Sequence, residues 1–82
     1  MFGDSGIPRR APDEGTLKTI RERYPEGCRV VLDSMGDFYA PPIGTAGTVR
    51  CVDSMGTIHV QWDNGSSLGV VYGEDSCHRV ND

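Results

Sequence analysis

Two short runs of alternating apolar and polar side chains, joined by tight turns, constrain the fold of this chain more than any other feature. Residues 48–52 and 57–62 repeat with the period of two that is typical of a half-buried β-strand. Residues 53–56 (Asp-Ser-Met-Gly) supply a turn between them, and an Asn-Gly pair at 64–65 is a strong signal for a second hairpin. The pattern predicts a three-stranded antiparallel meander whose last strand covers residues 67–72.

Alternation also predicts which side chains of the meander form the core. Ile58, Val60 and Trp62 share one face of their strand. In the preceding strand, Val49 and Cys51 share a face, and we expect that face to point inward as well. Trp62 is therefore predicted to be a core residue rather than a surface platform for a ligand.

Two further short strands are expected, at residues 28–32 and 77–80. A loop of about ten residues (33–42) follows the first of them, which is long for a compact domain. Five short strands with tight middle hairpins indicate a small SH3-like antiparallel barrel over residues 28–80, since closing the sheet removes most exposed strand edges. The predicted fold class is thus mainly β with one N-terminal α-helix.

That helix is expected over residues 13–24. Asp13 suits the N-cap position, and Pro25 lacks the backbone N–H that would continue the helix. Residues 1–12 mix Gly, Pro and charge without periodicity, and this composition predicts a flexible tail. The chain is therefore expected to hold a tail and one domain, residues 13–82.

The charge of the chain is unevenly distributed. Its 82 residues include 8 Lys/Arg and 12 Asp/Glu, which give a formal net charge of −4. Residues 33–82 hold two of the basic residues and seven of the acidic ones, a net of −5, whereas residues 1–32 hold six and five. An acidic barrel repels phosphate backbones, so nucleic acid is the less favoured partner.

The sequence favours a cytoplasmic protein with reduced thiols. No stretch is apolar over enough residues to span a membrane, and the first residues lack the charged and apolar regions of a secretory signal peptide. Cys28, Cys51 and Cys77 are an odd number of cysteines, which favours free thiols packed as small hydrophobic side chains. A single disulfide is the alternative.

The sequence predicts neither a metal site nor an enzyme. Zinc would need the cysteines together with His59 or His78, but no CxxC or HxxxH spacing is present. Cys51 and His59 are expected on opposite faces of the sheet, so they do not form a nucleophile–base pair. The carboxylates of Glu74 and Asp75 lie in an exposed turn, where nothing raises a pKa. No Gly-rich phosphate loop precedes a helix, and no cofactor is expected.

Binding to a protein partner is the function that the pattern favours most. SH3-like barrels often bind extended peptides beside the long first loop, on aromatic platforms with charged rims. Three aromatic and three acidic candidates follow from the predicted loops: Phe38, Tyr39, Tyr72, Asp37, Asp63 and Glu74. Asp63 is alternatively expected to cap the Asn-Gly turn that follows it. The partner is expected to be a protein or peptide, and the domain a monomer or a weak homodimer.

The chain carries five motifs in order, namely YPEGCRVVL (24–32), MGD (35–37), APPIGTAGTV (40–49), WDNGSSL (62–68) and VYGED (71–75). On these motifs, the chain resembles a bacterial domain family of unknown function over residues 16–80. Members of that family are short proteins often carried on plasmids, conjugative elements or phages. The resemblance therefore implies a small barrel in a bacterial or mobile-element setting, without an assigned activity. The three cysteines depart from the family pattern, which argues against a cysteine-based role.

Two nucleic-acid hypotheses stay open beside protein binding. The Gly44-x-x-Gly47-x-Val49 piece looks like the turn motif of KOW-type barrels, which often bind RNA or proteins. An accessory role on nucleic acid would use the basic residues near the N-terminus: Arg9, Arg10, Lys18, Arg21, Arg23 and Arg29. In the second hypothesis, the acidic barrel mimics nucleic acid and blocks a DNA-binding enzyme.

Overall fold

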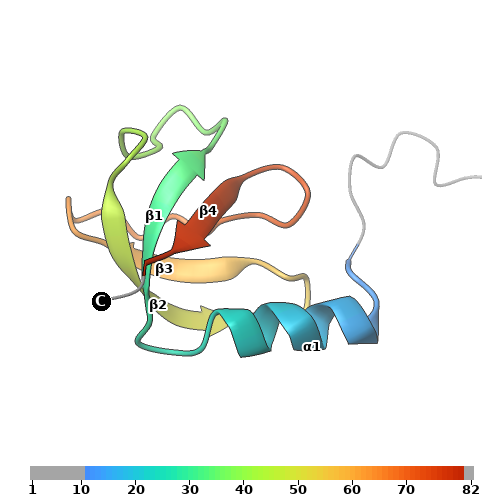
Figure 1. Cartoon of the computed structure of the whole chain (residues 1–82). Helices are drawn as coiled ribbons and strands as arrows, with labels where there is room; N and C mark the ends of the chain where they lie inside the picture. Colours follow the sequence, from blue (N-terminus) through green and yellow to red (C-terminus); the bar gives the residue numbers. More distant parts are fainter. Residues whose placement is uncertain (1–10, 81–82) are drawn as a thin grey trace, which may run out of the picture.

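The computed structural model describes residues 11–80, in which one helix is followed by four strands (Figure 1). The elements are α1 (Glu14–Arg23), β1 (Arg29–Ser34), β2 (Ala46–Val52), β3 (Ile58–Trp62) and β4 (Ser76–Arg79). The strands form one antiparallel sheet in the order β3-β2-β1-β4, and α1 lies beside β2. The predicted mainly β fold with one N-terminal helix is confirmed. Most of the predicted flexible tail, residues 1–10, lies outside the described residues.

The predicted closed barrel of five strands is wrong: over residues 11–80 the sheet has four strands and stays open. The missing strand is residues 67–72, which run beside β3 without forming a ladder. Within this segment only Val70 pairs with the sheet, through two backbone hydrogen bonds of 2.9 and 2.8 Å with Ile58. A single bridge holds the segment against β3 but does not extend the sheet toward closure.

The indole of Trp62 explains why the ladder stops. The backbone N–H of Trp62 donates to the carbonyl of Ser66 at 2.8 Å, so the hairpin starts regularly. The next hydrogen-bonded pair of a regular antiparallel hairpin would join Val60 with Leu68. Instead, the Leu68 carbonyl accepts from the Trp62 indole Nε1 at 2.8 Å. The Leu68 carbonyl is therefore hydrogen-bonded to a side chain rather than to the backbone of β3.

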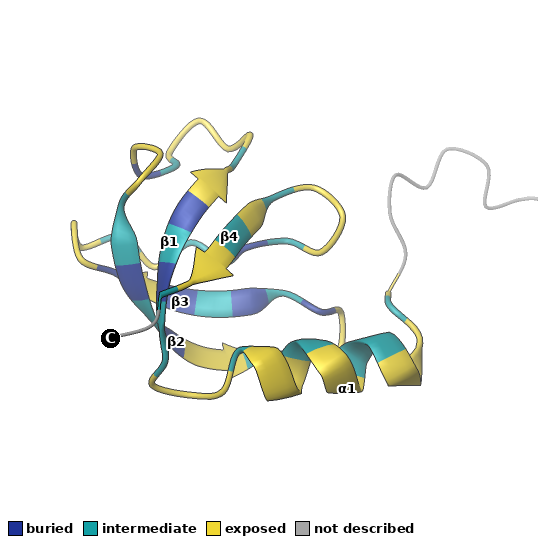
Figure 2. Ribbon diagram, in the orientation of Figure 1, coloured by how far each residue is buried: buried dark blue, intermediate teal, exposed yellow. Residues whose placement is uncertain are grey.

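The core consists of aliphatic side chains around one indole, and Figure 2 shows buried positions along β1, β2 and β3. Its buried members come from β1, β2, β3 and the bridge: Val30, Leu32, Val49, Ile58, Val60, Trp62 and Val70. The predicted inward face of β3 is thereby confirmed, and the exposed fraction of Trp62 is 1%. Ile20 and Tyr24 of α1 are half-buried and pack against this cluster.

A bulge in β2 reverses one predicted face. The pairing of β2 with β3 shifts register between Val49 and Cys51, which leaves Arg50 as an extra residue. One extra residue reverses the alternation, because successive side chains of a strand point to opposite faces. The prediction that Cys51 points into the core is therefore wrong: Cys51 is exposed, and Val52 packs against the core instead.

Side-chain hydrogen bonds fix where α1 begins and where it meets the sheet. The Asp13 carboxylate accepts from the Thr16 backbone N–H at 2.8 Å, and this hydrogen bond lowers the pKa of Asp13. At the other end, the Tyr24 hydroxyl donates to the Cys77 carbonyl at 3.3 Å and ties the helix to β4. No helix in the described range is long and apolar enough to cross a membrane.

Candidate protein-binding surface

Two adjacent aromatic side chains project into solvent from the loop between β1 and β2. The exposed fractions are 91% for Phe38 and 77% for Tyr39. Their rings pack edge to face, with centroids 5.1 Å apart and an interplanar angle of 89°. Ile43, which is also exposed, adds an aliphatic side chain to the same loop. We call Phe38, Tyr39 and Ile43 the aromatic loop.

Hydrogen bonds close the turn that carries the two rings. The Asp37 carboxylate accepts from the Tyr39 backbone N–H at 2.7 Å, and the Ala40 N–H donates to the Asp37 carbonyl at 3.0 Å. Beyond the turn, the Gly44 N–H donates to the Leu32 carbonyl at 2.9 Å and anchors the loop to β1. The rings are therefore presented on a backbone that is held at its base and at its tip.

Asp63 lies on the β3 hairpin and has a structural role. Its carboxylate binds the Arg29 guanidinium with both oxygens, and Arg29 also donates to the Thr48 hydroxyl at 2.9 Å. The hydrogen bonds from Arg29 lower the pKa of Asp63. The Asn-Gly turn is capped by Asn64, whose side-chain oxygen accepts from the Ser66 N–H at 3.0 Å. The prediction that Asp63 caps this turn is therefore wrong.

Tyr72 and Glu74 belong to the turn that precedes β4, where both are exposed. Tyr72 lines a groove of about 210 Å³ between this turn and α1. The walls of the groove are mostly apolar and include Ile20, Tyr24, Ile58, Val70 and Cys77. The six predicted binding residues thus fall on three segments: the loop between β1 and β2, the β3 hairpin and the turn before β4. The structure gathers three of them, residues 37–39, in one turn.

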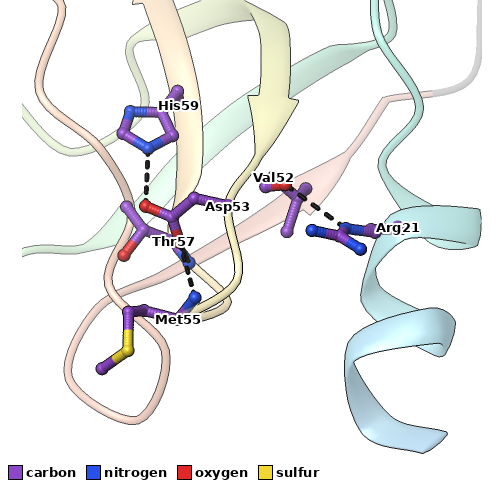
Figure 3. A network of polar contacts seen from close by, with 6 residues as sticks. All are labelled: Arg21, Val52, Asp53, Met55, Thr57 and His59. Carbon is purple, nitrogen blue, oxygen red and sulfur yellow. Dashed lines mark hydrogen bonds and ion pairs between the residues drawn. The ribbon is translucent and has the colours of Figure 1, made fainter. Parts of the chain in front are cut away.

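A polar network organises the hairpin between β2 and β3 (Figure 3). The Asp53 carboxylate accepts from the backbone N–H groups of Met55 and Thr57 at 2.9 and 3.0 Å. Its other oxygen lies 2.9 Å from Nε2 of His59. Both oxygens of Asp53 therefore contact groups of its own hairpin. The same carboxylate holds His59 across the hairpin.

Acid is expected to weaken the fold through Asp53. Burial raises the pKa of this carboxyl, but hydrogen bonds from His59, Thr57 and Met55 outweigh burial and lower the pKa below its ordinary value of 3.8. Such a carboxyl adds stability at pH values above its unfolded pKa, and this stability is lost as the pH falls through the folded pKa. The free energy of unfolding should therefore decline below about pH 4.

Urea unfolding curves across the acid range measure this decline. Asp53→Asn should show a shallower decline than the wild type, because its side chain no longer titrates. Asp13 and Asp63, whose pKa values are also lowered, account for the part that persists. Equal acid sensitivity in the wild type and in Asp53→Asn would contradict the assignment.

Among the described residues, no group of three or more His, Cys, Asp or Glu side chains is placed to hold a metal ion. The three cysteines are free thiols. Burial, together with the charges of Asp33 and Cys28, raises the pKa of Cys77 to about 11, so this thiol stays protonated at neutral pH. Nδ1 of His78 contacts the Asp33 carboxylate at 2.8 Å.

Three features of this surface differ in how far they can be predicted from the sequence. Ile43 follows two prolines in a stretch without alternation, so no pattern marks it as part of an exposed apolar site. The groove depends on a contact between Tyr24 and Cys77, which are 53 positions apart. The pairing of Asp53 with His59 could be predicted from the sequence, because a carboxylate that begins a tight turn lies close to the strand that follows it.

Comparison with known proteins places the chain in a family. Residues 13–80 match the family model described as "Domain of unknown function (DUF4314)". Among curated proteins and among solved structures, none matches the chain. The family match includes α1, all four strands β1 to β4 and the aromatic loop. Because it covers most of the 82 residues, the chain belongs to the DUF4314 family, a family of domains of unknown function.

Proposed function

We propose that this domain is a non-enzymatic module that binds a protein partner through the aromatic loop, in the cytoplasm and in a bacterial or mobile-element setting. The observation that carries the proposal is the exposure of Phe38 and Tyr39 at adjacent positions of one anchored turn. Contiguous apolar side chains left in water are typical of surfaces that become buried in a complex.

The geometry of the turn suits protein recognition for two physical reasons. Each aromatic ring offers a large apolar area, and aromatic side chains are among those that dominate binding free energy at interfaces. The hydrogen bonds of Asp37 close the turn before a partner arrives, so less conformational freedom is lost on binding. The net charge of −5 over residues 33–82 favours a partner with a basic binding surface.

Removal of both rings should weaken binding to the partner and leave the fold intact. For the double variant Phe38→Ala/Tyr39→Ala, we expect the free energy of unfolding to stay within about 0.5 kcal/mol of wild type, because both side chains are exposed. Partner affinity should fall at least about tenfold, as is usual when aromatic anchors are truncated. Affinity capture with quantitative mass spectrometry identifies the partner, and calorimetry with the purified partner measures the loss.

Met55→Ala is the matched control for this experiment. Met55 is an exposed apolar residue on a different turn, and it contacts Asp53 through its backbone N–H rather than its side chain. This variant should retain full affinity. If the double variant binds the captured partner as tightly as wild type does, the aromatic loop is not the binding site.

A nucleic-acid role has less support, because the fold already engages part of the basic set. Arg29 is held by Asp63, and Nε of Arg21 donates to the Val52 carbonyl at 3.3 Å (Figure 3). Mobility-shift assays across salt concentrations test this alternative. Binding to generic DNA or RNA that falls steeply with salt, and that Arg21→Ala and Arg23→Ala weaken, would favour it over protein binding.

A further inference from the structure

The two rings of the aromatic loop stand at right angles, with most of their surface in water. The interplanar angle of Phe38 and Tyr39 is 89°, and their centroids are 5.1 Å apart. Exposed fractions of 91% and 77% mean that the domain itself covers little of either ring. The face of an aromatic ring carries partial negative charge, which attracts a cation placed over it. The rings therefore offer a site for positive charge as well as for apolar side chains.

A carboxylate is fixed beside these rings. Oδ1 of Asp37 accepts from the Tyr39 backbone N–H at 2.7 Å. Among residues 11–80, no donor reaches the second oxygen, Oδ2. A carboxylate has about four lone-pair positions, so a single backbone N–H leaves most of its capacity for hydrogen bonds unused. Asp37 is exposed, and its carboxylate can accept further donors from a partner.

The surroundings of the loop supply no cation from the helix. Asp37 is the one charged residue of the stretch 34–49. Three of the basic residues belong to α1, and Figure 1 shows the loop between β1 and β2 at the end of the sheet opposite this helix. The electrostatic character of the loop is therefore set by one carboxylate and two ring faces, all of which attract positive charge.

A partner that covers the Tyr39 ring brings Asp37 into the same interface, because the carboxylate is bonded to the backbone of Tyr39. Removal of a carboxylate from water is costly unless a cation and hydrogen-bond donors replace the water. A purely apolar partner supplies neither. An arginine side chain supplies both, since its planar guanidinium stacks on a ring while its N–H groups donate to a carboxylate. A lysine ammonium is more strongly hydrated and lacks the planar shape.

We propose that the aromatic loop recognises an arginine side chain of its protein partner, with the guanidinium over the rings of Phe38 and Tyr39 and against Oδ2 of Asp37. This assignment rests on the protein-binding function proposed above and adds the chemistry of the residue that is recognised. Asp37 then has two tasks, because Oδ1 closes the turn and Oδ2 binds the ligand. Contacts of this kind at an exposed site are individually weak, so a single arginine should bind in the millimolar range.

Short peptides test the assignment before the partner is known. In a nuclear magnetic resonance titration of the full chain, acetyl-Gly-Gly-Arg-Gly-Gly-amide should shift the resonances of residues 37–39. Citrulline has the shape of arginine without its charge, and a citrulline peptide should bind about tenfold more weakly. A lysine peptide should bind about threefold more weakly than the arginine peptide. Equal affinities for arginine and citrulline would contradict recognition of a cation, and equal affinities for arginine and lysine would contradict the choice of arginine.

Asp37→Asn removes the charge and keeps the turn, since an Asn side-chain oxygen can also accept from the Tyr39 N–H. We expect the affinity for the arginine peptide to fall about fivefold and the thermal midpoint to match wild type. Glu26→Gln removes the same charge at an exposed position after α1 and should leave the affinity unchanged. An equal affinity in Asp37→Asn and wild type would show that the carboxylate does not bind the ligand.

The captured partner separates a wrong ligand from a wrong surface. We expect both Asp37→Asn and Phe38→Ala/Tyr39→Ala to weaken its binding. If only the double variant does so, the aromatic loop binds the partner without an arginine, and the protein-binding function stands. If neither variant changes the affinity, the aromatic loop is not the binding site, and both the function and the arginine assignment are wrong.

Discussion

Replacement of Trp62 by alanine is expected to lower the free energy of unfolding by about 3–5 kcal/mol. The indole is 1% exposed and is the largest of the fully buried side chains. Its Nε1–H also donates to the Leu68 carbonyl, so truncation leaves both a cavity and a carbonyl without its donor. A domain of this size has a total stability of about 4–10 kcal/mol. The variant should therefore lose about half of that stability.

Urea unfolding followed by circular dichroism measures this loss, since the substitution removes the one tryptophan that fluorescence would report. Trp62→Phe separates packing from hydrogen bonding. Phenylalanine keeps much of the apolar contact but has no N–H for the Leu68 carbonyl, so a smaller loss of about 1–3 kcal/mol is expected. A loss below about 1 kcal/mol for Trp62→Ala would mean that the indole does not support the core.

Gly47→Ala should be the second large effect, with a loss of about 2–3 kcal/mol. Gly47 is buried in β2, where it pairs with Val30 on one side and with Trp62 on the other. A Cβ at this position would lie 2.5 Å from the Val60 Cγ1, 2.8 Å from the Trp62 Cε3 and 2.9 Å from the Gln61 carbonyl oxygen. One methyl group therefore forces both a core side chain and the backbone of β3 to shift.

Gly36→Ala is the matched control, because a Cβ at Gly36 would meet nothing within 4 Å. This exposed glycine should accept alanine with a change within about 0.5 kcal/mol. Thermal unfolding resolves the difference between the two variants, since 1 kcal/mol shifts the midpoint of a domain this small by about 4–8 °C. Similar midpoints for Gly47→Ala and Gly36→Ala would contradict close packing between β2 and β3.

The inward face of β3 could be predicted because its signal is local. Ile58, Val60 and Trp62 alternate with polar residues, and the strand is short enough that no bulge interrupts its period of two. The start of α1 was predictable for a similar reason, because the capping residue Asp13 and its partner Thr16 are three positions apart.

The wrong predictions share a different cause, which is that a tertiary contact overrides a regular pattern. The bulge at Arg50 reverses which of Cys51 and Val52 faces the core, and no residue type in that run indicates a bulge. The alternation of residues 67–72 is typical of a strand. The Leu68 carbonyl, however, accepts its hydrogen bond from the Trp62 indole and not from the backbone of β3. Neither event follows from spacing alone.

The candidate site was predictable in part. Phe38 and Tyr39 stand in a loop without alternation, and such a loop offers no sheet face that would bury them. The preference of Asp for turns is a local rule, and it predicts a turn cap at Asp63. Its actual partner, Arg29, lies 34 positions earlier and meets it only once β1 and β3 flank β2.

Asp75 links the groove with the segment that leads into the aromatic loop. One carboxylate oxygen accepts from the Val71 N–H at 3.0 Å, and the other accepts from the Gly36 N–H at 3.4 Å. Segments joined in this way tend to open and close together, as one cooperative unit. A ligand that reduces the motion of either segment therefore also reduces the conformational entropy that the other segment loses when it binds its own ligand.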